Sequence, residues 1–178
     1  TGSFAELANF YIERDYQYEV IGFIVSDDYL DINQNRFNNK KVYPLSKIKK
    51  IFDPKDVEIF VAVAYRGFNT IREEICNEIK KNGYKLFSYI SPKTTIYDIE
   101  SIGENVFIFE DNTIQPFTAI GNGVILWSGN HIGHHTKIED WVFVASHAVV
   151  SGHCVIGKYS FLGVNCTIAD TIKIGKKN

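Results

Sequence analysis

From Ile96 to the end of the chain, a large aliphatic residue recurs at every sixth position. An amphipathic helix repeats its apolar residues at intervals of three and four, and a strand with one buried face repeats them at two. An unbroken interval of six over nearly eighty residues therefore predicts a repeat architecture. The positions are Ile96, Ile102, Ile108, Ile114, Ile120, Leu126, Ile132, Ile138, Val144, Val150, Ile156, Leu162, Ile168 and Ile174.

Small or apolar residues also occupy most positions two places before these aliphatics, so each six-residue unit has two inward side chains on a short strand. Three such strands, joined by bends, close a triangular coil of eighteen residues. The aliphatics then stack in columns, such as Ile96, Ile114 and Ile132, while the backbone of each coil pairs with the coils above and below. The repeat predicts a parallel β-helix over residues 91–178.

Residues 1–90 lack this period and alternate between helical and extended patterns, with Ser3 placed to cap the first helix. Strands that alternate with helices predict a small parallel α/β layer that ends near Ser91-Pro92. Because no strand precedes the first helix and the last coil is uncapped, we also expect the sequence to be trimmed at both termini. We expect helices at 3–14, 45–51 and 69–81, strands at 18–26, 41–43, 57–64 and 85–89, and a loop from 27 to 39.

The charge and cysteine content of the chain exclude several classes of partner. A net charge of -2 and the lack of a basic run give no reason to expect nucleic acid or a membrane surface. No apolar stretch approaches the roughly 20 residues that span a bilayer, and no signal peptide is visible. Of the odd set Cys76, Cys154 and Cys166, the last two fall at inward positions, which argues against a disulfide framework. We expect a cytoplasmic protein.

All five histidines of the chain lie within 23 residues of one another, and none occupies an inward position of the repeat. His134 is the candidate general base, because Gly152 lies one coil later and leaves open space beside the imidazole. A backbone N–H at Gly152 is also a candidate donor for a developing oxyanion. Imidazole changes its protonation state near neutral pH, which suits a base for acyl transfer. For His131 and His153, a solvated polar face is the alternative interpretation.

Two segments, GNHIGHHTKIED at 129–140 and SGHCVIGKYSFLGVNCTIAD at 151–170, follow the α/β region and resemble the PglD/NeuD-like sugar acyltransferases. The resemblance implies a Rossmann-like nucleotide-sugar-binding domain at 1–90 and a left-handed β-helix acyltransferase domain at 91–178. It implies direct N-acetylation by acetyl-CoA of a UDP- or dTDP-linked 3- or 4-amino sugar, in lipopolysaccharide, O-antigen or other surface glycan biosynthesis. It further implies a homotrimer with active sites between subunits, and no metal.

The resemblance assigns the catalytic set to His134, His135 and Gly152. One branch of the family has a glutamate after the base, where this chain has His135. That second imidazole can orient the base only if it is neutral and accepts a hydrogen bond. Glu139 and Asp140 are the other candidates for orienting His134, with a solvated acidic corner as their alternative reading.

The resemblance also assigns binding residues. It places the coenzyme A pantetheine against Phe143, Gly152 and Val164. It assigns the nucleotide sugar to Gly2, Ser3, Phe4, Asp27, Asp28, Ala64, Asn130 and His131. A carboxylate after the second strand suits ribose hydroxyls, although Asp-Asp is also common in turns.

Three other functions fit parts of the sequence. A sugar or sialate O-acetyltransferase uses the same fold. A zinc-dependent hydratase of the γ-carbonic-anhydrase kind would take His134, His135 and His153 as ligands. A β-helix without catalytic activity would serve as an assembly scaffold. Cys154 and Cys166 are expected to behave as small buried hydrophobes, so no covalent acyl-enzyme is predicted.

Overall fold

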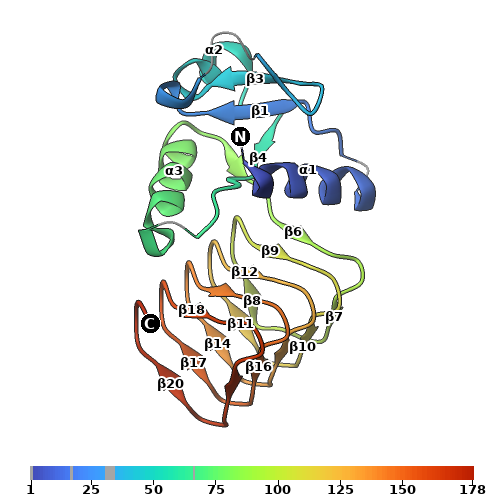
Figure 1. The fold of residues 1–178 in the computed structure, drawn as a ribbon, viewed down its shortest axis with the longest axis vertical. Helices are drawn as coiled ribbons and strands as arrows, with labels where there is room; N and C mark the ends of the chain where they lie inside the picture. Colours follow the sequence, from blue (N-terminus) through green and yellow to red (C-terminus); the bar gives the residue numbers. More distant parts are fainter. Residues whose placement is uncertain (1, 17, 31–34, 66) are drawn as a thin grey trace.

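The computed structural model describes residues 2–16, 18–30, 35–65 and 67–178. They form an N-terminal α/β unit and a β-helix, which lie one against the other (Figure 1). Helices α1 (Ser3–Asp15) and α3 (Thr70–Lys81) lie on the side of the α/β unit that faces the β-helix. No helix in the described ranges is long and apolar enough to cross a bilayer.

Two-residue strands build the β-helix and fall into three parallel sheets, which form the three walls of the coil. The first wall contains β7 (Thr95–Ile96), β10 (Thr113–Ile114), β13 (His131–Ile132), β16 (Val149–Val150) and β19 (Thr167–Ile168). The second wall contains β8 (Ser101–Ile102), β11 (Ala119–Ile120), β14 (Lys137–Ile138), β17 (Val155–Ile156) and β20 (Lys173–Ile174). The third wall contains β6 (Tyr89–Ile90), β9 (Phe107–Ile108), β12 (Ile125–Leu126), β15 (Phe143–Val144) and β18 (Phe161–Leu162).

The pairing register confirms the coil of eighteen residues. Ile114 lies opposite Ile132 in the first wall, and Ile120 lies opposite Ile138 in the second. The inward residues of the three walls form one continuous hydrophobic core, which also contains the fully buried Cys154. Strands that recur every six residues and pair in three parallel walls fit the predicted left-handed β-helix. Strand β6 pairs with β9, so the third wall already begins next to the expected boundary at residue 91.

The α/β unit is irregular. Besides α1 and α3 it contains the elements β1 (Gly22–Val25), η1 (Asp27–Tyr29), β2 (Arg36–Phe37), β3 (Lys40–Pro44), η2 (Leu45–Lys47), α2 (Ile48–Ile51), β4 (Glu58–Ile59), η3 (Gly67–Asn69) and β5 (Lys85–Leu86). In the described residues these strands form two separate sheets, β1-β3-β2 and β4-β5. The pairs β1-β3 and β4-β5 are parallel, as expected, but they do not join into one layer, and a Rossmann-like arrangement is not confirmed.

A β-hairpin occupies part of the segment that we expected to be a loop. Strands β2 and β3 pair antiparallel, with Arg36 opposite Lys41 and Phe37 opposite Lys40. The two residues between them, Asn38 and Asn39, have φ values of 47° and 61°. Two consecutive left-handed residues match the twist of a two-residue hairpin, and asparagine adopts this conformation readily. Residues 31–34 of the expected loop lie outside the described residues.

Two other local expectations are corrected. The expected strand at 57–64 is reduced to β4, because the next part of the chain leaves the sheet. There the Val61 N–H donates to Asn105 Oδ1 of the β-helix at 2.8 Å, in place of a neighbouring strand. The N-cap of α1 is Gly2, whose carbonyl accepts from the N–H groups of Ala5 and Glu6, and Ser3 is already the first helical residue.

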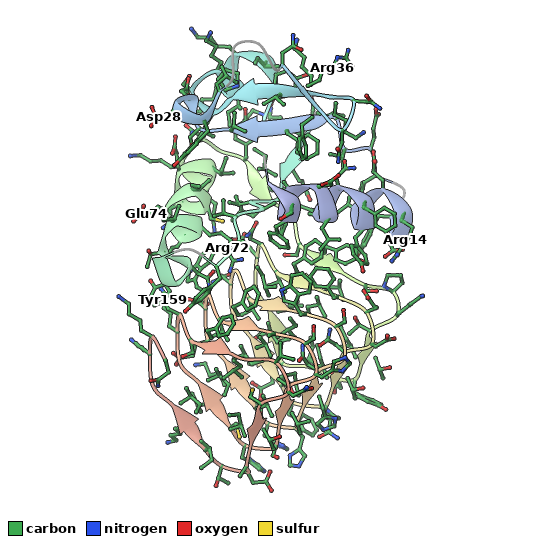
Figure 2. All side chains as sticks on the ribbon, viewed as in Figure 1. Arg14, Asp28, Arg36, Arg72, Glu74 and Tyr159 are labelled. Carbon is green, nitrogen blue, oxygen red and sulfur yellow. The ribbon has the colours of Figure 1, made fainter. Side chains whose placement is uncertain are left out.

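Polar contacts from α3 hold the two units together (Figure 2). The fully buried Arg72 guanidinium donates to the Gly123 carbonyl and lies over the Trp141 ring, with its carbon Cζ 5.7 Å from the ring centroid. Burial lowers the pKa of Arg72 to about 10, so the group stays charged at neutral pH. Glu73 binds Lys158 at 2.9 Å and also accepts from the Tyr159 hydroxyl. These contacts fix the α/β unit against the bend between the second and third walls.

Candidate functional site

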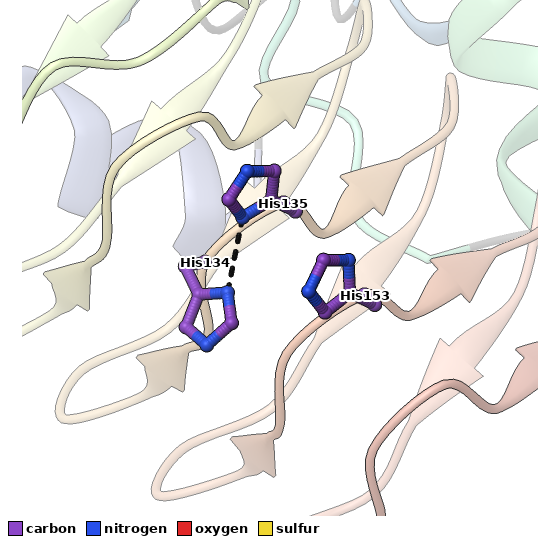
Figure 3. Close-up of side chains that lie close together, drawn as sticks. All are labelled: His134, His135 and His153. Carbon is purple, nitrogen blue, oxygen red and sulfur yellow. Dashed lines mark hydrogen bonds between the residues drawn. The ribbon is translucent and has the colours of Figure 1, made fainter.

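The bend between the first and second walls carries an exposed group of imidazoles (Figure 3). Strand β13 ends at Ile132, and His134 and His135 then turn the chain towards β14. The backbone approach to the next coil is close, because a Cβ at Gly133 would lie 2.5 Å from the Ser151 carbonyl carbon. His135 has a φ of 57°, the left-handed conformation found at every bend of this corner from Phe117 onward. The bend therefore holds both histidine rings outside the core.

His134 and His135 contact each other through their Nδ1 atoms, which are 3.0 Å apart, with the two rings perpendicular. A hydrogen bond at this distance needs a proton on one nitrogen and a lone pair on the other. When His134 is the donor, its Nε2 keeps a free lone pair and His135 is the neutral acceptor. This is the arrangement under which we expected His135 to orient the base.

The His134 ring also packs against Gly152, as the stacking of coils predicted. A methyl group at position 152 would lie 2.8 Å from Cε1, 3.0 Å from Nε2 and 3.2 Å from Nδ1 of His134. Real Cβ atoms essentially never approach another atom so closely, so only glycine leaves this ring in place. Gly152 itself is buried.

The expectation of a free N–H at Gly152 is wrong in the folded chain. That N–H donates to Asp170 Oδ1 at 2.7 Å. Asp170 lies eighteen residues after Gly152, and it binds the backbone of the coil below in the way that Asp140 binds the Asn122 N–H. The eighteen residues between Gly152 and Asp170 were therefore a signal in the sequence that the two lie on adjacent coils. Gly152 provides space for His134, but its N–H is already paired.

Glu139 and Asp140 do not orient His134 within the chain. Glu139 Oε2 accepts from the Lys158 N–H at 3.0 Å, and Asp140 Oδ1 accepts from the Asn122 N–H at 2.8 Å. Both carboxylates follow β14 and so lie at the bend between the second and third walls, one corner away from His134. Glu139 and Asp140 are close to His134 in sequence but not in space, because strand β14 of the second wall separates the two bends.

His153 from the next coil joins the two histidines. Its ring stacks on that of His135, with centroids 4.7 Å apart and planes at 15°, and lies perpendicular to that of His134 at 5.1 Å. One ring nitrogen from each residue lies within 4.8 Å of the others. The three residues proposed as zinc ligands in the hydratase alternative are therefore together, and this group has the donors to hold a transition metal.

Asn130 is a structural residue, contrary to its expected role in sugar binding. Its exposed fraction is 1%, its side-chain nitrogen donates to the Trp127 carbonyl, and its Oδ1 accepts from the Ala148 N–H at 2.8 Å. Asn130 lies two places before Ile132, which is an inward position of the repeat, so the sequence did contain the signal. His131 lies half-buried on the outer side of β13 and stays a prediction.

The residues expected to bind the nucleotide lie in the α/β unit, away from His134. Asp27 is already engaged, because its carboxylate accepts from the Ser46 hydroxyl at 2.6 Å and the Ser46 N–H at 3.1 Å, and these bonds lower its pKa. Gly2, Ser3, Asp28 and Ala64 are exposed, whereas Phe4 packs edge-on against Phe60 and Phe107. Among the described residues, no hydrogen bond or ring contact joins Gly2–Phe4 to Asp27, Asp28 or His134.

The expected coenzyme A contacts lie on different parts of the triangle. Phe143 is on the third wall and stacks on Phe161, with centroids 5.2 Å apart. Val164 follows β18 at the bend between the third and first walls and is 65% exposed. Gly152 lies beside His134 at the bend between the first and second walls. One chain alone does not bring these residues together.

Comparison with known proteins identifies the repeat and the fold. The family model for bacterial transferase hexapeptide (six repeats) matches residues 117–152. No curated protein sequence matches the chain.

Solved structures match over nearly the whole chain. One is a histidine-to-asparagine variant of perosamine N-acetyltransferase from Caulobacter crescentus in complex with CoA and GDP-perosamine, with a TM-score of 0.83, 18% identity, and coverage of 98% of this chain and 80% of that chain. Another is the acetyltransferase domain of PglB from Neisseria gonorrhoeae in complex with acetyl coenzyme A, with a TM-score of 0.81, 22% identity, and coverage of 98% and 82%. A third is WeeI from Acinetobacter baumannii, with a TM-score of 0.66, 20% identity, and coverage of 99% and 85%.

These matches confirm the resemblance that the segments at 129–140 and 151–170 indicated. The repeat match includes His134, His135 and Gly152. The structural matches extend to the α/β unit, because they cover 98% or more of the chain. The chain thus contains bacterial transferase hexapeptide repeats and has the fold of perosamine N-acetyltransferase and of the PglB acetyltransferase domain.

Proposed function

We propose that this chain is an acetyl-CoA-dependent N-acetyltransferase that acts on a nucleotide-linked amino-deoxy sugar. The observation that carries the proposal is the exposed His134 imidazole, which packs on Gly152 and contacts His135 through Nδ1. The proposal is supported by the fold shared with two acetyltransferases solved with CoA or acetyl coenzyme A, one of which also holds GDP-perosamine, an amino sugar on a nucleotide.

In the proposed reaction, the sugar amine attacks the thioester carbonyl carbon and forms the new C–N bond. His134 Nε2 takes the proton that the attacking nitrogen releases, and the C–S bond then breaks. The proton passes from His134 to the departing thiolate, so that free CoA and the N-acetyl sugar are the products. His135 accepts from Nδ1 of His134 throughout, and thus favours the imidazolium that forms during transfer. No step requires a protein acyl intermediate.

A substrate panel tests this function. The purified chain should release CoA from acetyl-CoA only when a 3-amino or 4-amino sugar nucleotide is present, with UDP, dTDP and GDP as the carriers compared. Mass spectrometry should show one added acetyl group that resists mild base, because amides survive conditions that hydrolyse esters. A base-labile product would favour the O-acetyltransferase alternative. Failure to acetylate any member of the panel, with folded protein, would count against the function itself.

We propose further that the active enzyme is a homotrimer with its sites between subunits. Phe143 on the third wall and Val164 at the bend between the third and first walls both lie apart from the bend that carries His134. A second copy is therefore needed for either residue to approach the ligand of His134. A threefold rotation closes the assembly into a ring of three subunits, and closed symmetric oligomers are far more common than open filaments. We expect sedimentation equilibrium to give three times the mass of 20.3 kDa. A stable monomer with full activity would contradict it.

Replacement of His135 by phenylalanine tests its role as the acceptor for His134. Phe117 already holds this left-handed conformation one coil earlier, at φ 62°, so the backbone tolerates the ring. The variant keeps the stacking on His153 and loses only the acceptor nitrogen. We expect kcat to fall by about 10-fold, the effect of one lost hydrogen bond of about 1.4 kcal/mol to the imidazolium, with KM little changed. Rescue by asparagine, which offers an acceptor oxygen, is expected, and an unchanged kcat in H135F would remove His135 from the mechanism.

A further inference from the structure

The imidazole cluster of His134, His135 and His153 has a second chemical capacity besides base catalysis. Among the described residues, this cluster is a group of potential metal ligands. It offers one ligand atom from each of its three residues, and these atoms all lie within 4.8 Å of one another. The three residues come from two adjacent coils, and all three side chains are exposed (Figure 3). In the single chain, a metal ion in solvent can therefore reach the cluster.

The distances are close to those of a zinc site. With Zn–N bonds of about 2.0–2.1 Å, two nitrogens of a tetrahedral site are about 3.3 Å apart. His134 and His135 already hold their Nδ1 atoms at 3.0 Å. The ligand atom of His153 lies within 4.8 Å of the other two, so metal binding requires this exposed ring to rotate about its side-chain torsions and bring its nitrogen nearer. The backbone is fixed, because the His153 N–H donates to the His134 carbonyl at 2.9 Å.

We propose that this cluster binds Zn²⁺ and that the bound ion switches off the transferase. This inhibition rests on the proposed function, whereas the binding does not. The metal would replace the proton that His134 and His135 share between their Nδ1 atoms. A neutral imidazole bound to metal through Nδ1 carries its proton on Nε2. His134 Nε2 is then a donor and has no lone pair for the substrate amine, so metal binding and base catalysis exclude each other.

The binding is tested without any activity measurement. Zn²⁺ titrated against a chromogenic chelator should show one site per chain, and Co²⁺ should give the visible absorption bands of a tetrahedral nitrogen site. The matched variant is H153N, because Asn165 adopts the same backbone at φ 57° as His153 does at φ 56°. This variant should lose at least about 10-fold in zinc affinity, as expected for a lost ligand. No binding by the native chain, or equal affinity in H153N, would overturn the site.

The inhibition is tested on product formation, measured by mass spectrometry because zinc also binds free thiols. Zinc should inhibit the native enzyme reversibly, with activity restored by EDTA, and should inhibit H153N only at concentrations at least about 10-fold higher. The inhibition of each variant is expressed relative to its own rate without zinc. Mg²⁺ is the control ion, since it prefers oxygen ligands. Tight zinc binding without inhibition would overturn the switch, and a chain that binds zinc but transfers no acetyl group would instead refute the proposed function.

Discussion

H134A is expected to lower kcat by about 10²- to 10⁴-fold, the usual loss on removal of a general base. The fold should be unaffected, because the His134 ring lies outside the hydrophobic core and its backbone N–H still donates to Gln115 Oε1, at 3.0 Å. The measurement is the steady-state rate of N-acetylation with saturating acetyl-CoA. Thermal unfolding should give the same Tm as the native chain.

Two comparisons make this result specific. K173A removes an exposed side chain from the second wall and should leave kcat and Tm unchanged. Added imidazole should restore part of the rate of H134A, because it supplies the missing base, and it should do nothing for K173A. A kcat near the native value in H134A would eliminate His134 from the mechanism, and loss of rate without imidazole rescue would point to a structural effect.

G152A is expected to lower kcat by roughly 10²-fold, because displacement of a catalytic group by about 1 Å has an effect of this size. The new methyl group would lie 2.8 Å from His134 Cε1, so the ring must move out of its position. The glycine itself has no left-handed φ, so alanine adds no backbone strain. Steady-state kinetics on the purified variant give the measurement.

G163A is the matched control, because a methyl group at Gly163 meets nothing within 4 Å. It should have native kcat and Tm. The double variant H134A/G152A identifies the cause: if the methyl group acts by displacing the imidazole, it has no further effect once the imidazole is gone. Additive losses in that double variant would show that Gly152 acts independently of His134.

The sequence predicted the β-helix accurately, whereas in the α/β unit it predicted the helices but not how the strands pair, for one physical reason. In the β-helix, each inward residue is determined by its distance along the chain, because every coil repeats the same backbone path. In the α/β unit, the strands pair at unequal separations along the chain, such as Phe37 with Lys40 and Glu58 with Lys85, so no period gives the partner of a strand. Val61, for example, binds Asn105 instead of a neighbouring strand, and neither residue has a local signal for this contact.

The candidate site shows the same division. The sequence by itself determined that His134 stacks on Gly152, and that His135 and His153 lie one coil apart at the same bend, because both follow from the eighteen-residue period. Only the tertiary structure decided what each polar group binds. The period places Asp170 one coil after Gly152, but the structure decided that its carboxylate binds the Gly152 N–H, and it turned His134 Nδ1 towards His135. The period positions Cα atoms, whereas hydrogen bonds depend on side-chain torsions and on competition among nearby donors and acceptors, which no spacing along the chain specifies.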